Sequence, residues 1–172
     1  MPNAANFNEI SLKLSSIDVQ IRTSAFSDLI KNIKLIEPNY LTRISAGLFY
    51  YYLYADTIKE QIKIRSEILE LMDKVNNDIK QSFRTIFLES LVKMWESLKK
   101  EKIQIFLLFL KEFFFKVYTE FYNSTNFKSN MVNWNDFLST CIIFNSKGVF
   151  ISFIRCFGVI VCVAKNKESF TS

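Results

Sequence analysis

Only three glycines and two prolines occur in the 172 residues of this chain, and this scarcity constrains its fold more than any other feature. Glycine and proline form most of the tight turns that join short strands. A β-sandwich or β-barrel of this length would need many such turns. Apolar residues recur instead at three- and four-residue spacing, which places them on one face of a helix. The sequence therefore predicts long helices and an all-α fold.

The stretch GLFYYYLYAD at residues 47–56 carries almost no charge. Leu41, Ile44 and Leu48 lead into it at helical spacing, which favours a helix over a buried strand. At about 100° per residue, its apolar side chains spread around the whole circumference of a helix. The run is shorter than the roughly 20 apolar residues that span a membrane. We expect a central helix that its neighbours enclose, with tyrosine hydroxyls reaching polar partners at its edges.

Residues 57–75 carry two adjacent apolar stripes, which together cover about 180° of a helix and predict contacts on two sides. The first stripe contains Ile58, Ile62, Leu69 and Met72, and the second contains Ile64, Ile68, Leu71 and Val75. Residues 103–122 are the most hydrophobic long segment, but their polar residues gather on one half of the helical wheel, so an amphipathic helix is expected. Helices of this kind favour stacked antiparallel helix pairs, as in a HEAT/armadillo-like helical repeat.

The chain is expected to form a helical-repeat core over residues 1–122. Residues 123–172 then form an atypical C-terminal segment with one or two further helices. Within this segment, residues 134–144 are typical of a helix, and residues 149–164 are typical of a buried helix or strand. Membrane attachment through residues 149–164 is the alternative, although Arg155 interrupts a run already shorter than a usual span.

The composition argues against most catalytic chemistry. The chain has no histidine, which removes the usual general base and the commonest metal ligand. Its three cysteines show no CxxC spacing, and an odd number of thiols is typical of a reduced, intracellular protein. Neither GxxxxGK[ST] nor GxGxxG occurs, and Glu67, Glu70 and Asp73 are expected to form a solvated face. We expect no enzyme, no cofactor, no metal site and no small-molecule substrate.

A formal net charge of +5 makes the chain mildly basic. Lys99, Lys100 and Lys102 gather at an expected corner between two helices, where flexible ammonium groups could contact RNA phosphate or a partner protein. An ordinary solvated loop is the alternative. A second, more dilute group of basic residues on an earlier helix contains Arg22, Lys31 and Lys34. Neither group resembles the sequence signature of an RRM or KH domain.

The Gly-Leu-Phe-Tyr run at residues 47–50, followed by Asp56, resembles the best-known block of the nucleolar ribosomal RNA-processing protein 1 family, the Nop52-type family. In that family a tryptophan and a lysine precede the glycine, where this chain has Ser45 and Ala46. The lysine-proline that usually follows the aspartate is replaced by residues 57–58, Thr-Ile.

Two further blocks carry the same resemblance. Arg22 and Ala25 are similar to the Arg-x-x-Ala step in the family's first helical pair. Residues 87–90, Phe-Leu-Glu-Ser, followed by Trp95 and Phe106, are similar to its Phe-Leu…Trp…Phe block.

The resemblance covers residues 10–122 well, and residues 147–154 only faintly. It implies a non-catalytic helical scaffold of the nucleolus, acting in pre-rRNA processing and large-subunit assembly within pre-ribosomal particles. The implied partners are proteins of these particles and precursor rRNA, and no membrane is expected. A generic helical-repeat adaptor between proteins, unrelated to ribosomes, is the alternative function.

Overall fold

The computed structural model describes residues 6–95 and 97–122, and these residues form helices and loops but no strand. In chain order the helices are α1 (Phe7–Leu14), α2 (Val19–Asn32), the 3-10 helices η1 (Ile33–Leu35) and η2 (Pro38–Tyr40), α3 (Leu41–Leu53), α4 (Ile58–Lys74), α5 (Asn77–Trp95) and α6 (Lys100–Tyr122). The predicted all-α fold class is confirmed. The expectations for residues 134–144, 147–154 and 149–164 lie outside the described residues.

The chain divides into two compact units, residues 1–97 and residues 98–172. Helices α1 to α5 belong to the first unit, and α6 begins the second. The domain boundary that the sequence places after residue 122 stays a prediction.

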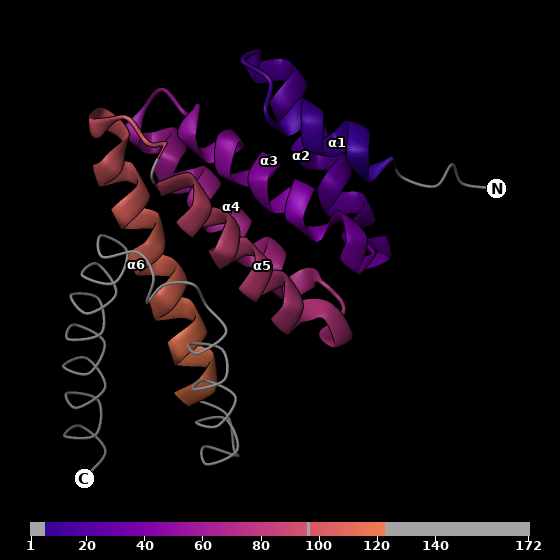
Figure 1. The fold of residues 1–172 in the computed structure, drawn as a ribbon. Helices are drawn as coiled ribbons and strands as arrows, with labels where there is room; N and C mark the ends of the chain where they lie inside the picture. Colours follow the sequence, from indigo (N-terminus) through magenta and orange to yellow (C-terminus); the bar gives the residue numbers. More distant parts are fainter. Residues whose placement is uncertain (1–5, 96, 123–172) are drawn as a thin grey trace, which may run out of the picture. The chain divides into compact units, whose positions relative to one another are not determined.

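Within the first unit the helices stack in pairs around α3. Helix α3 contacts α1, α4 and α5, and α2 packs against α1. Figure 1 shows α1, α3 and α5 running side by side as one layer. The pair α1/α2 is thus followed by the pair α3/α4, as expected for a HEAT/armadillo-like repeat. Helix α3 therefore contacts α1 of the first pair, its own partner α4, and α5.

The tyrosine-rich helix α3 is enclosed on most of its surface. Nine of its 13 residues are buried, and Tyr52 and Leu48 are completely inaccessible. The Tyr51 ring stacks on Phe26 of α2, with 4.9 Å between ring centroids. Burial raises the pKa of Tyr51, whose side chain hydrogen-bonds to Thr23. The prediction of an enclosed central helix is confirmed for most of α3, and Tyr51 has the polar partner expected at the edge. Burial around the whole circumference is wrong, because Tyr50 and Tyr54 are each 36% exposed.

Gly47 lets α1 approach α3 closely. A Cβ atom at this position would lie 2.8 Å from the backbone oxygen of Ser11 and 3.1 Å from Cβ of Leu14. The first distance is shorter than any ordinary contact, and the atom concerned belongs to the backbone of α1. A side chain at residue 47 would therefore force the two helices apart.

The two-sided burial expected of α4 holds for only part of this helix. Ile64, Ile68 and Leu71 are buried as predicted, together with Leu69, Met72 and Val75. Ile58 and Ile62 are 76% and 53% exposed, so the prediction that they belong to a buried stripe is wrong. They occupy the first two turns of α4, whereas the buried residues of this helix begin at Ile64.

Helix α6 is amphipathic, as predicted. Its buried face contains Phe106, Phe109, Leu110, Phe113, Phe114 and Val117. Gln104 and Lys111 are exposed on the opposite side. Among the described residues, no helix combines the length and the apolar character that crossing a membrane requires.

Ser45 provides a stability test of the α3 core. Its hydroxyl is fully buried and has no hydrogen-bond partner among the described residues. A buried polar group without a partner costs roughly 1–3 kcal/mol. We therefore expect Ser45→Ala to raise the free energy of unfolding by about 1 kcal/mol, as measured by urea denaturation.

The control for this prediction is Ser90→Ala. The Ser90 hydroxyl is also buried, but it donates a hydrogen bond to the carbonyl oxygen of Ile86 at 2.8 Å. Its removal should leave stability unchanged or lower it. Equal effects of the two substitutions would contradict the assignment of Ser45 as an unsatisfied group.

Candidate nucleic-acid interface

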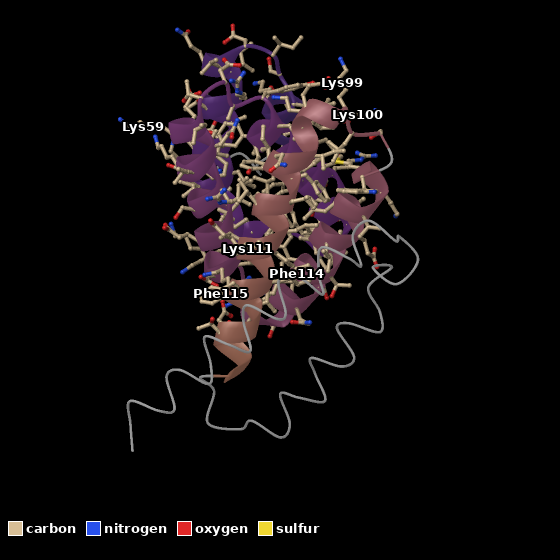
Figure 2. All side chains as sticks on the ribbon, turned by 90° about the vertical axis from the view of Figure 1, so that its left-hand side faces the viewer. Lys59, Lys99, Lys100, Lys111, Phe114 and Phe115 are labelled. Atoms are coloured by element: carbon tan, nitrogen blue, oxygen red, sulfur yellow. The ribbon has the colours of Figure 1, made fainter. Side chains whose placement is uncertain are left out.

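The basic corner predicted at residues 99–102 forms the start of α6. The backbone N–H of Lys102 donates to the carbonyl oxygen of Lys99 at 2.9 Å, which closes the first turn of the helix. Lys99 and Lys100 are exposed, and neither forms an ion pair or side-chain hydrogen bond with any described residue. Lys102 is half-buried and already interacts with another group. Two of the three predicted contacts, labelled in Figure 2, are therefore exposed lysines without an ion-pair partner among the described residues.

The position of these lysines has an electrostatic consequence. The first N–H groups of an α-helix lack partners within the helix and carry a partial positive charge. Lys99 and Lys100 add two full positive charges at the same end of α6. Glu101 follows them in the first turn of α6 and is also exposed. Its negative charge reduces the net positive charge at this end of the helix. The start of α6 can thus attract a phosphate or carboxylate group.

The sequence did not single out Phe115, which lies further along the same helix. Within the run Phe-Phe-Phe at residues 113–115, the first two rings are completely buried, whereas Phe115 is 42% exposed. Lys111 lies one turn before Phe115 and is also exposed (Figure 2). The helical wheel already places Phe115 with the polar residues of α6, and this could have identified it.

Arg22, placed by the sequence in a second basic surface group, is instead a buried structural residue. It is 3% exposed. Its guanidinium group donates to the carbonyl oxygen of Ile17 at 2.6 Å and to that of Tyr54 at 3.0 Å. Lys31 is exposed and paired with Asp28 at 3.3 Å. Lys34, in η1, is exposed. The three residues therefore do not form one cluster of exposed cations.

Glu67, Glu70 and Asp73 of α4 lie toward solvent, although Asp73 also pairs with the buried Arg84. Asp73 lies 3.1 Å from Lys80 and 3.6 Å from Arg84, both of which belong to α5. Glu67 lies 3.7 Å from Lys63, and Glu70 is exposed. No group of histidine, cysteine, aspartate or glutamate residues in the described part of the chain is arranged to hold a metal ion.

Glu60 is the acidic residue with the clearest structural task. Its carboxylate accepts hydrogen bonds from the backbone N–H groups of Thr57 and Asp56, at 3.2 and 3.1 Å. The Thr57 hydroxyl in turn accepts from the N–H of Glu60, completing a capping box at the start of α4. The backbone hydrogen bond from Thr57, and then that from Asp56, lowers the pKa of Glu60 below its usual 4.5.

This lowered pKa predicts a dependence of stability on pH. The ionised form of Glu60 is favoured by the folded state, so its contribution is present above pH 4.5 and is lost as the pH falls through the lowered pKa. At neutral pH we expect Glu60→Gln to be less stable than the unaltered chain, and the difference should shrink in acid. Urea denaturation as a function of pH, with Glu70→Gln as the control on the same helix, measures it. A difference that stays constant down to acid pH would contradict the capping role.

Comparison with known families identifies the relatives of this chain. A family model described as "Nucleolar protein, Nop52" matches residues 7–160. The chain belongs to the Nop52 family. It is therefore a protein of the nucleolus, within the nucleus, with a role in ribosome biogenesis. No individual curated protein matches the chain significantly.

The residues that resemble the Nop52 family blocks have structural tasks in this chain. Gly47 permits the close approach of α1 to α3. Arg22 links the loop before α2 to the end of α3. Ser45, which stands where the family has a tryptophan, is a fully buried small residue. Phe87 and Phe106 are completely buried. The buried residues of these blocks therefore maintain the fold, whereas Tyr50 and Asp56 of the first block are exposed.

Proposed function

We propose that this Nop52-family chain is a non-catalytic scaffold that acts in pre-rRNA processing and large-subunit assembly within pre-ribosomal particles. The observation that carries the proposal is the family match over residues 7–160. The stacked helix pairs of the first unit support it, because such stacks present extended surfaces to partners. Its partners are particle proteins and precursor rRNA.

Two properties of the chain support a role without catalysis. The sequence contains no histidine. Among the described residues, the acidic side chains with notable surroundings serve structure: Glu60 caps α4, and Asp73 pairs with Lys80 and Arg84 of α5. Neither arrangement supplies a general base near a reactive nucleophile.

Association with particles provides the first test. The tagged full chain should co-sediment with large-subunit precursor particles and co-purify with other assembly factors and precursor rRNA. Depletion should lead to accumulation of unprocessed precursor rRNA, visible by hybridisation. A chain that sediments alone, together with normal rRNA precursors after depletion, would contradict the proposal and favour an adaptor unrelated to ribosomes.

Within this function, Lys99 and Lys100 are proposed contacts to RNA phosphate or to an acidic protein surface, with Lys102 as a neighbouring contact. Reversing both charges in Lys99→Glu/Lys100→Glu should weaken particle association, and the loss should become smaller at high salt because screening weakens the original attraction. Lys59→Glu is the control, because Lys59 is an exposed lysine on α4 that pairs with no residue the structure describes (Figure 2). Equal retention of both variants on particles would exclude the corner as a contact.

A further inference from the structure

The exposed side of α6 combines unpaired lysines with an exposed aromatic ring. At about 100° per residue, five exposed residues fall within an arc of about 80° on the helix circumference. They are Lys100, Gln104, Leu108, Lys111 and Phe115, here called the α6 stripe. With a rise of about 1.5 Å per residue, the stripe extends over about 22 Å. Figure 2 shows Lys100 at the start of α6 and Lys111 and Phe115 further along it.

The charges of the α6 stripe are available to an anionic partner. Neither Lys100 nor Lys111 forms an ion pair with any described residue. By contrast, Lys116 lies off the stripe and is paired with Glu120 at 3.8 Å. Two carboxylates flank the stripe. Glu101 lies in the first turn, where the partial positive charge of the helix end stabilises it, and Glu112 is half-buried and already interacts with another group. Two exposed lysines without a carboxylate partner in the described part of the chain favour an anionic occupant over a neutral one.

The exposed ring of Phe115 indicates which class of anionic partner fits the α6 stripe. Phe115 lies four residues after Lys111, so the two side chains are neighbours on the helix surface. Phe115 keeps 42% of its surface exposed, whereas Phe113 and Phe114 are buried. Proteins that bind single-stranded nucleic acid use this combination, with cations along the phosphate backbone and an aromatic ring against a base.

We propose that the α6 stripe binds single-stranded RNA, with Phe115 stacking on a base and Lys100 and Lys111 contacting phosphates. The proposal rests on the proposed function, which brings the chain next to precursor rRNA. Stacking on a phenylalanine tolerates every base, so binding depends little on sequence. The stripe extends the basic corner at Lys99 and Lys100 into a surface that holds both the backbone and a base.

The test uses the purified full chain and a fluorescent single-stranded oligouridine of about 12 nucleotides, within the site sizes of about 4–16 nucleotides found for single-strand binders. Fluorescence anisotropy measures the dissociation constant at several salt concentrations. Phe115→Leu should weaken binding about 5- to 150-fold without changing the salt dependence, because it removes stacking but no charge. Phe115→Trp should keep the affinity.

The lysines should have the complementary effect. Lys100→Ala/Lys111→Ala should reduce the slope of log affinity against log salt by about 0.7 for each phosphate that the variant no longer neutralises, or about 1.4 in total. Lys59→Ala, which removes an exposed lysine from α4, is the control and should leave the slope unchanged. Circular dichroism should show unaltered helix content in every variant, since all the substituted residues are exposed.

Three results of the binding assay would overturn the inference: no oligouridine binding by the unaltered chain, equal affinity of Phe115→Leu and Phe115→Trp, or an unchanged salt slope in the double lysine variant. Sedimentation with pre-ribosomal particles separates this failure from failure of the proposed function. A chain that enters particles but fails these tests keeps the function and loses the stripe as an RNA site. Loss of a particle protein from the Phe115→Leu variant, with RNA binding intact, would instead identify the stripe as a protein contact and also overturn the inference.

Discussion

Gly47→Val is expected to lower the free energy of unfolding by about 3 kcal/mol, at the upper end of the usual cost of overpacking a core. The reason is the position of the new Cβ atom, which would lie 2.8 Å from the backbone oxygen of Ser11. A flexible side chain could rotate away from such a contact, but the backbone of α1 can yield only if the helix moves. Movement of α1 away from α3 would disturb the packing between two neighbouring helices of the same layer.

Two controls isolate this effect from helix propensity. Ala46→Val introduces the same side chain at the preceding, half-buried position of α3 and should cost less than about 1 kcal/mol. Gly47→Ala should have an intermediate effect, because alanine favours the helix by about 1 kcal/mol over glycine while its Cβ causes the same close contact. Urea denaturation followed by circular dichroism compares the three variants. Equal stability of Gly47→Val and Ala46→Val would refute the close packing of α1 on α3.

The enclosed helix α3 could be predicted from the sequence because its apolar residues occupy nearly the whole helical circumference. A helix with this pattern must bury most of its surface, so its central position follows from the pattern itself. The pattern did not show that Tyr50 and Tyr54 stay 36% exposed. The same argument was insufficient for α4. The periodicity shows that Ile58 and Ile62 share a face with Leu69, but it does not show where the neighbouring helix ends. Whether their turns are covered depends on packing, and both residues are exposed.

The site was predicted less completely than the fold, for two physical reasons. An arginine in a polar helix resembles any surface cation, and the acceptors of Arg22 lie 5 and 32 residues away along the chain. No local pattern could reveal this pairing. Phe115 follows two other phenylalanines in a hydrophobic segment, so it resembled a core residue. Only its position on the wheel, next to Lys111, distinguished it. In contrast, the charge run of residues 99–102 identified the exposed Lys99 and Lys100 directly, although Lys102 is half-buried.

Arg22→Met is expected to lower the free energy of unfolding by about 2–4 kcal/mol. The guanidinium group is buried and joins two segments that are far apart in the sequence. They are the loop that contains Ile17 and the end of α3 at Tyr54. Hydrogen bonds to a charged group contribute roughly 1.5–3 kcal/mol each, and methionine replaces the apolar volume without donating to either carbonyl. Both carbonyl oxygens would then lose their charged donor.

The control is Lys31→Met on the same helix. Lys31 forms an exposed ion pair with Asp28, a kind of contact that contributes at most about 1 kcal/mol, so its removal should scarcely change stability. Arg22→Lys is the more demanding comparison, because it keeps the positive charge but replaces the planar fork with one ammonium group that cannot readily reach both carbonyl oxygens. If the role of Arg22 is to join two backbone segments, lysine should restore only part of the missing stability. Full restoration of the stability by lysine would contradict this role. It would show that a positive charge beside the end of α3 matters more than the geometry of the two hydrogen bonds, since a cation near the C-terminus of a helix is favourable in itself.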